Sequence, residues 1–329
     1  MNPLTACRNP AQEAADRAPD GMSPRVLEPS PPAVIDGDFF ADDPVALADG
    51  DPETTLRPFT AGTQPARPTW QAAGADDTEL ASFAADRWLG PWHRLGAVPT
   101  NYVAQREAFH RLAYSVVAAA RHAENGKFGL RFTAGGFGTP FFGEDRQVRV
   151  VGNTLVDQVG DTVRTMQPGS IKAAAEFIGV EPSTVAAEGD SPPLGDPSGP
   201  LDLDPATGDF LGAWFGFATS VLEELRAAAP ESAQPGRTQL WPGHFDPAVE
   251  LGDESAGHRA TFGASPGDAG SAEPYLYVGP WAGTTDDPFW NASAFPGALL
   301  PFDQLLTASE QRQTAIDFFR RAIELLTNR

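Results

Sequence analysis

The pattern of hydrophobic positions predicts a long amphipathic helix shortly after residue 100. Phe109, Leu112 and Val116 recur at intervals of three and four residues, which is typical of one buried helix face. The pair Asn125-Gly126 follows and predicts the helix end, because glycine readily adopts the left-handed conformation that closes a helix. We therefore expect a helix that is buried along one side and ends near residue 125.

The next segment changes to the alternating pattern of strands. Strands are predicted at 147–151, 154–159 and 162–166, and short turns that contain glycine separate them. Such turns between alternating runs are strong hairpin signals, so an antiparallel meander is expected. A short helix over 171–178 should follow, with Ser170 as its N-cap.

The second half of the chain repeats this order of elements. Asp204 and Pro205 have the residue types of an N-cap and a first helical position, so they predict the start of a second long helix. Strand-like runs follow at 239–251, 259–263 and 275–278. Thr307 and Glu310 have the spacing of a capping box, which predicts that the last helix begins there.

Helices and strands are thus grouped rather than alternating as βαβ units. This order predicts an α+β fold in which antiparallel β-meanders pack against long amphipathic helices. The parallel order of elements leaves open two similar halves, 77–180 and 204–329, within a single α+β domain spanning 77–329. Residues 1–76 are rich in proline and acidic residues and have no sustained period, so we predict a disordered N-terminal segment.

Composition excludes several classes of function. The chain has 44 acidic and 23 basic residues and a net charge of -21, which opposes binding to nucleic acid or to anionic lipid. Its single cysteine excludes an intrachain disulfide framework. No run of apolar residues is long enough for a transmembrane helix, and the N-terminus lacks the apolar region of a secretory signal. A soluble cytoplasmic protein is expected.

Two glycine-rich motifs resemble known sites but lack the required context. Residues 263–267 read Gly-Ala-Ser-Pro-Gly, which matches a nucleophile elbow, yet a loop follows Ser265 and no histidine comes later in the chain. Residues 135–138 read Gly-Gly-Phe-Gly, without the spacing of a phosphate-binding loop or a following helix. We interpret residues 135–138 as structural.

The segment 241–247, Trp-Pro-Gly-His-Phe-Asp-Pro, carries the best candidates for chemistry. In an extended chain His244 and Asp246 would point the same way, because side chains two residues apart share a face. The pair could bind a metal ion, or Asp246 could orient the imidazole as a general base. The alternative is structural, with His244 bonded to backbone and Asp246 capping a turn.

Aromatic residues cluster around these candidates. Trp241, Tyr275, Tyr277 and Trp281 lie within about 40 residues of one another, and His258 is a further polar candidate nearby. Ligand pockets combine aromatic walls with a few placed polar groups, so these five residues are candidates for ligand binding. Each aromatic residue could equally belong to the core.

The C-terminal part resembles an uncharacterised actinobacterial family, a domain of unknown function. The likeness rests on the runs WPGHFD at 241–246, FGASPGD at 262–268, EPYLYV at 273–278 and FPGA at 295–298. It implies a bacterial cytoplasmic protein and supplies no reaction, cofactor or catalytic residue.

Three functions remain open at this stage. The first is a small-ligand-binding domain with an aromatic-lined pocket near residues 244–246. The second is an enzyme that uses His244 and Asp246, with or without a divalent metal. The third is an interaction protein whose acidic N-terminal segment binds a basic partner. The sequence predicts no specific cofactor and no oligomeric state.

Overall fold

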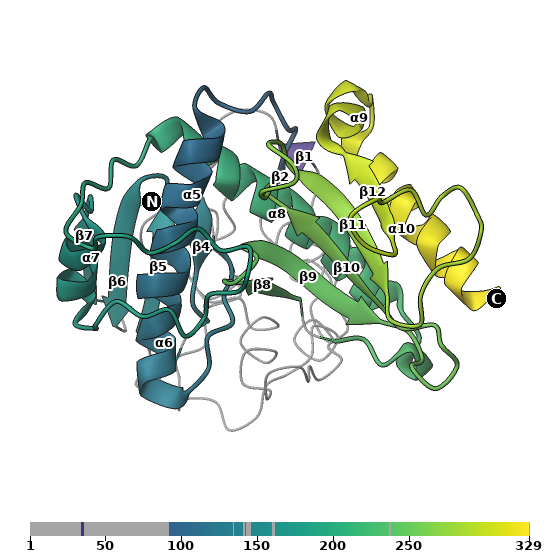
Figure 1. Cartoon of the computed structure of the whole chain (residues 1–329), viewed down its shortest axis with the longest axis horizontal. Helices are drawn as coiled ribbons and strands as arrows, with labels where there is room; N and C mark the ends of the chain where they lie inside the picture. The colour runs from purple at the N-terminus through teal and green to yellow at the C-terminus, as the bar shows by residue number, and fades with distance from the viewer. Residues whose placement is uncertain are drawn as a thin grey trace, which may run out of the picture.

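The computed structural model describes residues 34–35, 92–133, 135–140, 142, 146–159, 162–236 and 238–328 (Figure 1). Its first half consists of strands β1 (Val34–Ile35) and β2 (Trp92–His93), helix α5 (Tyr102–Leu112), π-helical segment η2 (Ala113–Val117), helix α6 (Ala118–Asn125), strands β3 (Arg131–Thr133), β4 (Gly136–Gly138), β5 (Arg146–Val151), β6 (Thr154–Val159) and β7 (Thr162–Met166), and helix α7 (Ile171–Ile178). The second half consists of helix α8 (Pro205–Ala228), 3-10 helix η3 (Glu231–Ala233), strands β8 (Gln239–Trp241), β9 (Asp246–Leu251), β10 (Ala260–Ser265), β11 (Tyr275–Pro280) and β12 (Ala298–Pro301), and helices α9 (Phe302–Thr307) and α10 (Gln311–Thr327).

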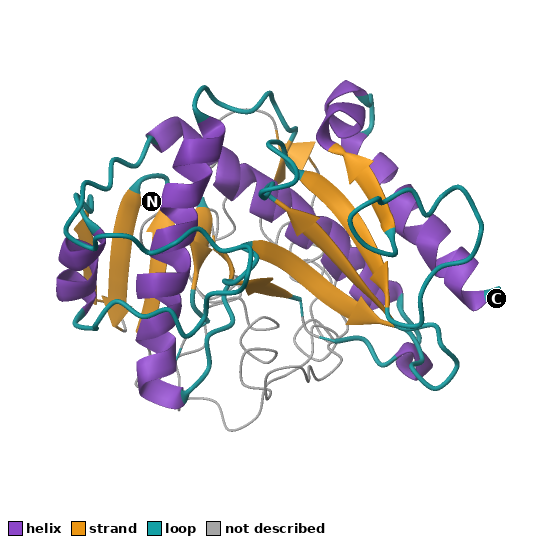
Figure 2. Cartoon of the chain, viewed as in Figure 1, coloured by secondary structure: helices purple, strands orange, loops and turns teal. Residues whose placement is uncertain are grey.

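Two antiparallel sheets of five strands form the centre of the molecule (Figure 2). Each is a simple meander, with strand orders β3-β4-β5-β6-β7 and β8-β9-β10-β11-β12. The sheets meet where Leu130 and Leu240 exchange backbone hydrogen bonds of 2.8 and 2.9 Å. The α+β class with antiparallel meanders, predicted from the sequence, is confirmed.

Helix α8 joins the two sheets. It packs against β3, β4 and β5 of the first sheet and against β9 and β10 of the second. Gly212 allows α8 to lie close to the backbone of Gly135, because a Cβ at Gly212 would lie 2.6 Å from the Gly135 carbonyl carbon. The glycine-rich segment 135–138 therefore serves packing, and most of it is strand β4 rather than a loop.

The face of the second sheet that carries Phe262 and Ala264 is covered by helices. Phe262 meets Phe319 of α10 edge-on, and the Trp214 indole of α8 donates to the Ala264 carbonyl. In Figure 1 both helices lie behind this sheet, so the opposite face of the sheet points toward the viewer. That opposite face carries the polar side chains described below.

Several local predictions are confirmed. The first long helix ends at Asn125, with Gly126 in the left-handed conformation. The Ser170 hydroxyl caps α7 by accepting from the Ala173 amide, and the Asp204 carboxylate caps α8 by accepting from the Thr207 amide. The residue pattern did not predict η2, which interrupts the first helix.

Two local predictions are wrong. Thr307 and Glu310 form no capping box: the Thr307 hydroxyl donates to the Asp303 carbonyl inside α9, and the side chain of Glu310 makes no capping hydrogen bond. The predicted run 239–251 is two strands, β8 and β9, because a tight turn at 242–245 separates them.

The predicted disordered segment 1–76 lies outside the described residues, except for Val34–Ile35, which pairs in parallel with Trp92–His93. The acidic segment proposed to bind a basic partner falls in the same undescribed part of the chain. In the part that is described, no helix has the length and apolar character needed to cross a membrane.

Candidate functional site

A strained turn between β8 and β9 sets the geometry of the site. Phe245 has a φ of 59°, a left-handed conformation that bulky residues rarely adopt. Its buried ring stacks on His110 at 5.0 Å and meets Phe137 and Phe215 edge-on at 5.0 and 5.1 Å. This anchoring in the core offsets the backbone strain, and it fixes the residues on either side.

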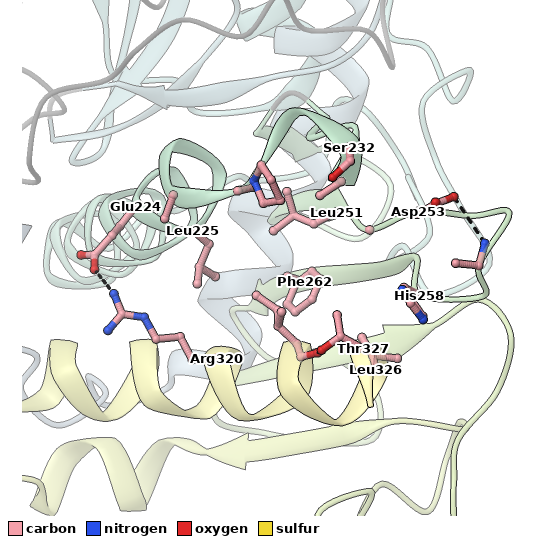
Figure 3. Close-up of a pocket in the computed structure, with 17 residues that line it drawn as sticks. Glu224, Leu225, Ser232, Leu251, Asp253, His258, Phe262, Arg320, Leu326 and Thr327 are labelled. Carbon is pink, nitrogen blue, oxygen red and sulfur yellow. Dashed lines mark hydrogen bonds and ion pairs between the residues drawn. The ribbon is translucent and has the colours of Figure 1, made fainter. Parts of the chain in front are cut away.

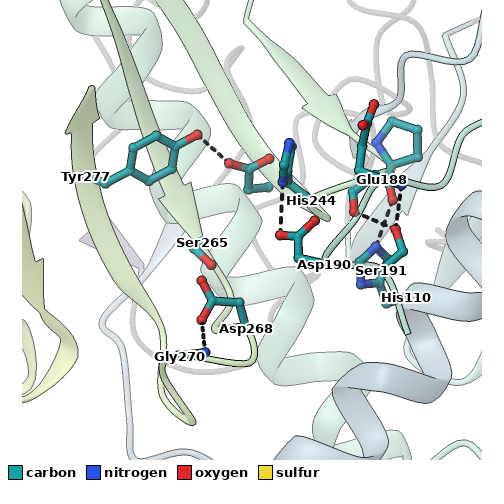
Figure 4. A network of polar contacts seen from close by, with 12 residues as sticks. His110, Glu188, Asp190, Ser191, His244, Ser265, Asp268, Gly270 and Tyr277 are labelled. Atoms are coloured by element: carbon teal, nitrogen blue, oxygen red, sulfur yellow. Dashed lines mark hydrogen bonds and ion pairs between the residues drawn. The ribbon is translucent and has the colours of Figure 1, made fainter. Parts of the chain in front are cut away.

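Two further elements hold the turn. His110 of α5 bonds through Nε2 to the Pro242 carbonyl at 2.8 Å, and the Ser191 hydroxyl donates to the Gly243 carbonyl at 2.7 Å (Figure 4). Burial lowers the pKa of His110 to about 4, so at neutral pH its imidazole is uncharged and donates from Nε2. The position of His244 is therefore determined by α5 and by the 180–203 loop.

The alternation of side chains along β9, β10 and β11 gathers polar groups on one face. Val249, Phe262 and Leu276 point into the core, and the residues between them point the other way. The polar face carries Asp246 on β9, Thr261 and Ser265 on β10, and Tyr275 and Tyr277 on β11.

Gly263 allows Tyr277 to reach across the sheet. Gly263 pairs with Tyr277 on one side and with Ala248 of β9 on the other. A Cβ at Gly263 would lie 2.3 Å from Cζ of the Tyr277 ring, so only glycine leaves room for this ring. The phenol of Tyr277 thereby crosses β10 and donates to Asp246 Oδ2 at 2.5 Å.

Asp246 is a buried carboxyl group with an unused acceptor. It is 3% exposed, and its Oδ1 has no hydrogen-bond partner. Burial raises the pKa of Asp246, and the hydrogen bond from Tyr277 offsets this only in part. A buried polar atom without a partner is costly, so this oxygen needs an explanation that the fold does not provide.

His244 forms an ion pair with Asp190 from the 180–203 loop. His244 Nδ1 lies 2.9 Å from Asp190 Oδ2, and the pair lies beside the pocket (Figure 4). This hydrogen bond raises the pKa of His244 to about 9, with a smaller contribution from the charge of Asp246. At neutral pH the imidazole is therefore positively charged.

A third carboxylate lies at the end of β10. The Asp268 carboxylate accepts from the Tyr275 phenol and from the amides of Gly270 and Ser271 at 2.6 and 2.8 Å. Burial, followed by the hydrogen bond to Asp268, raises the pKa of Tyr275, so this phenol remains protonated. Ser265 lies beside them and accepts from the Gly267 amide.

These groups surround a pocket of about 320 Å³, which also includes Gly279 and Phe295. We call it the polar pocket. Its charged groups are the carboxyl groups of Asp190, Asp246 and Asp268 and the His244 imidazole; no described residue that lines it is lysine or arginine. The polar pocket thus has an excess of negative charge.

A second pocket, of about 360 Å³, lies between α8, α10 and the turn after β9 (Figure 3). Its walls are mostly apolar, with Leu225, Leu251 and Phe262 among them. Its charged side chains are already engaged: Glu224 pairs with Arg320 at 2.9 Å, and Asp253 accepts from Ser255. None of its described lining residues has a buried polar atom without a hydrogen-bond partner, so it is the weaker candidate.

The structure brings together four of the seven candidate residues and separates the others. His244, Asp246, Tyr275 and Tyr277 line the polar pocket, whereas His258 lines the second pocket. Trp241 and Trp281 line neither pocket. Trp241 pairs with Asp246 in the sheet, and the half-exposed Trp281 donates to the Thr261 hydroxyl and stacks with Arg259.

The reason that His244 and Asp246 lie near each other differs from the expected one. They are not on one face of an extended strand, because the left-handed Phe245 lies between them in a turn. The imidazole takes Asp190 as its hydrogen-bond partner, and Asp246 takes Tyr277. The predicted His244–Asp246 pair is therefore replaced by two separate pairs.

Sequence reasoning missed Asp190, Ser265, Asp268 and Phe295. Asp190 comes from a loop without a motif, so only the folded structure reveals it. The other three belong to the runs FGASPGD and FPGA, which could have indicated them, since WPGHFD and EPYLYV supply His244, Asp246, Tyr275 and Tyr277. All four motif segments meet at the polar pocket.

Within the described residues, no group of three or more His, Cys, Asp or Glu side chains is arranged to hold a metal ion. Comparison of the chain with models of protein families, with curated proteins and with solved structures finds no match.

Proposed function

We propose that this protein binds a small molecule in the polar pocket. The observation that carries the proposal is Asp246, a carboxyl group that is 3% exposed, lines the pocket and has an unpartnered Oδ1. A fold that needed this residue only for stability would satisfy both oxygens, because an unpaired buried acceptor costs about 1–3 kcal/mol. A ligand that donates to this carboxyl group would remove that cost.

The surrounding structure supports the proposal. The turn that holds His244 is strained at Phe245, and strain of this kind concentrates at functional sites. Three aromatic rings and a few polar groups line the pocket, a combination that is typical of ligand sites. All four segments that resemble the uncharacterised actinobacterial family contribute residues to it.

Gly279 offers a way to fill the polar pocket. It lines the pocket, and a Cβ built on it meets no atom within 4 Å. Gly279→Leu should therefore fold and place an isobutyl group in the pocket. Gly96→Leu is the matched control, because Gly96 also has open space around its Cβ position and does not line the polar pocket.

The experiment screens a mixed library of small metabolites by ligand-observed NMR against the wild-type protein and both variants. We expect binders whose signals are lost with Gly279→Leu and retained with Gly96→Leu. A screen without binders, or binders that Gly279→Leu leaves unaffected, would refute the proposed function.

The Asp190–His244 pair favours a second candidate, an enzyme. The pKa of about 9 keeps His244 protonated at neutral pH, so its imidazolium could donate a proton to a bound molecule. In this role Asp190 would orient the ring through Nδ1, which leaves Nε2 for the substrate.

This candidate is tested on the binders that the screen identifies. Each is incubated with wild-type protein and with His244→Gln, and its NMR spectrum is followed over hours. Conversion that is slower with His244→Gln supports the enzyme; unchanged spectra of bound molecules contradict it.

A further inference from the structure

Among the described residues, the other buried carboxylates of this protein are paired with arginine. Asp157, which is as buried as Asp246 at 3% exposure, forms ion pairs with both Arg146 and Arg164. Glu223 pairs with Arg226 at 2.5 Å. Where the fold itself buries an acidic group, it thus provides a guanidinium beside it.

The carboxyl groups of the polar pocket depart from this rule. Within the described part of the chain, neither Asp246 nor Asp268 forms an ion pair with lysine or arginine. Arg106 contacts Asp268 through the backbone: its guanidinium donates to the Asp268 carbonyl oxygen at 3.3 Å. The one cation that lines the pocket, His244, is paired with Asp190.

The two phenol donors of the pocket and one imidazole nitrogen are also occupied. The phenols of Tyr277 and Tyr275 donate to Asp246 and Asp268, and His244 Nδ1 is bonded to Asp190. The buried polar atom of the pocket that has no partner is an acceptor, Asp246 Oδ1. A complementary ligand therefore brings both N–H donors and a positive charge.

The aromatic residues that line the polar pocket also favour a positively charged ligand. Tyr277 lies between two other rings of the pocket, with centroid distances of 6.2 Å to Tyr275 and 6.3 Å to Phe295. Aromatic rings beside carboxylates are a common environment for ammonium groups, because the ring quadrupole attracts a cation.

We propose that the ligand of the polar pocket carries a protonated primary or secondary amine, which binds beside Asp246. This inference rests on the proposed function and narrows it to one class of molecule. A quaternary ammonium fits less well, because it has no N–H group to donate to the unpartnered oxygen of Asp246.

The test uses three probes with equal numbers of heavy atoms and different charge: butylamine, which is protonated at pH 7, butan-1-ol, which is neutral, and propionate, which is an anion. Binding is measured by saturation-transfer NMR at physiological salt, which screens general attraction to an acidic protein. The proteins are wild type, Gly279→Leu, Asp246→Asn and the control Asp202→Asn, which removes an exposed carboxylate outside the pocket.

We expect butylamine to bind about tenfold or more tightly than butan-1-ol, and propionate not to bind. Asp246→Asn should weaken butylamine by about tenfold or more and leave butan-1-ol unchanged, because the amide keeps the shape and loses the charge. Asp202→Asn should change nothing.

Equal binding of butylamine and butan-1-ol, or amine binding that survives Asp246→Asn, would overturn the inference about the amine. If other molecules from the library still lose binding with Gly279→Leu, the proposed function stands and only the ligand class is wrong. If no molecule responds to Gly279→Leu, the proposed function fails as well.

Discussion

Two histidines on either side of the strained turn have opposite electrostatic environments. His110 is buried beside a carbonyl, and His244 is paired with a carboxylate. We predict NMR titration midpoints that match a pKa of about 4 for His110 and about 9 for His244. Asp190→Asn should lower the pKa of His244, whereas His110 should stay uncharged at neutral pH.

The same shift sets how stability depends on pH. Because folding raises the pKa of His244 from 6.5, the Asp190–His244 pair stabilises the fold fully below pH 6.5, and this contribution is lost as the pH rises through about 9. The difference in free energy of unfolding between wild type and Asp190→Asn should shrink over that window. A difference that grows with pH would contradict the assignment of the pair.

The Asp246 carboxylate should lower the free energy of unfolding at neutral pH, as expected of a group that serves a binding site rather than the fold. Its pKa is raised in the folded protein, so folding favours the protonated form and the carboxylate destabilises the fold above the unfolded pKa of 3.8. We predict that Asp246→Asn increases the free energy of unfolding at pH 7 by about 0.5–2 kcal/mol, and that this gain disappears in acid.

Urea melts at neutral and acidic pH measure this, with Asp202→Asn as the exposed control. A clear loss of stability at pH 7 would show instead that the Asp246 carboxylate is a structural group, which is the alternative that the sequence left open.

Single residues of the site were only partly predictable. His244 and Asp246 stood out because a histidine and a carboxylate lay two positions apart beside aromatic residues. Their actual partners, Asp190 and Tyr277, are 54 and 31 residues away in the chain. Local spacing cannot reveal such contacts, because the register of the sheet and the course of the loop bring them about.

At the scale of elements, strand β10 depends on a glycine that makes room for its neighbour. We predict that Gly263→Ala destabilises the protein by about 1–3 kcal/mol, because the added methyl group collides with the Tyr277 ring. Gly279→Ala on β11 is the matched control and should be neutral or slightly stabilising, since its Cβ position is open. Thermal or urea melts of both variants compare them; equal effects would contradict the crossing of Tyr277 over β10.

The elements themselves were largely predictable where a local signal defined them. The strands at 147–151, 154–159 and 162–166 had turns with glycine, and α7 and α8 had side-chain caps. The turn at 242–245 was missed because the left-handed residue is Phe245 rather than glycine, and only the buried ring cluster explains it. The false capping box shows that residue spacing alone does not establish a helix start.

For the whole molecule, the order of elements predicted the class of fold but not how the sheets join. The contact between Leu130 and Leu240 that links the two meanders is a pair of backbone hydrogen bonds, which leaves no pattern in the sequence. The position of α8 against both sheets likewise follows from close contacts such as that of Gly212 with Gly135.

Of residues 1–76, which the sequence predicts to be disordered, the structure describes only Val34–Ile35, and a deletion tests the prediction. Deleting residues 1–76 should lower the melting temperature by only a few degrees, because β1 contributes a two-residue parallel pair with β2. A deletion of residues 1–33, which keeps β1, is the control. A large drop with the longer deletion alone would place β1 within the cooperative fold and move the domain boundary.

The central claim is that the polar pocket takes a small molecule, and the four tyrosines of the chain allow a direct test. Tyr275 and Tyr277 line the pocket, whereas Tyr102 and Tyr114 are buried in the core. With 3-fluorotyrosine incorporated, fluorine NMR follows all four during a titration with butylamine. We predict that the resonances of Tyr275 and Tyr277 shift and saturate, while those of Tyr102 and Tyr114 stay nearly unchanged. Shifts confined to Tyr102 and Tyr114, or no shift at any tyrosine for butylamine or for the binders of the library screen, would contradict the account.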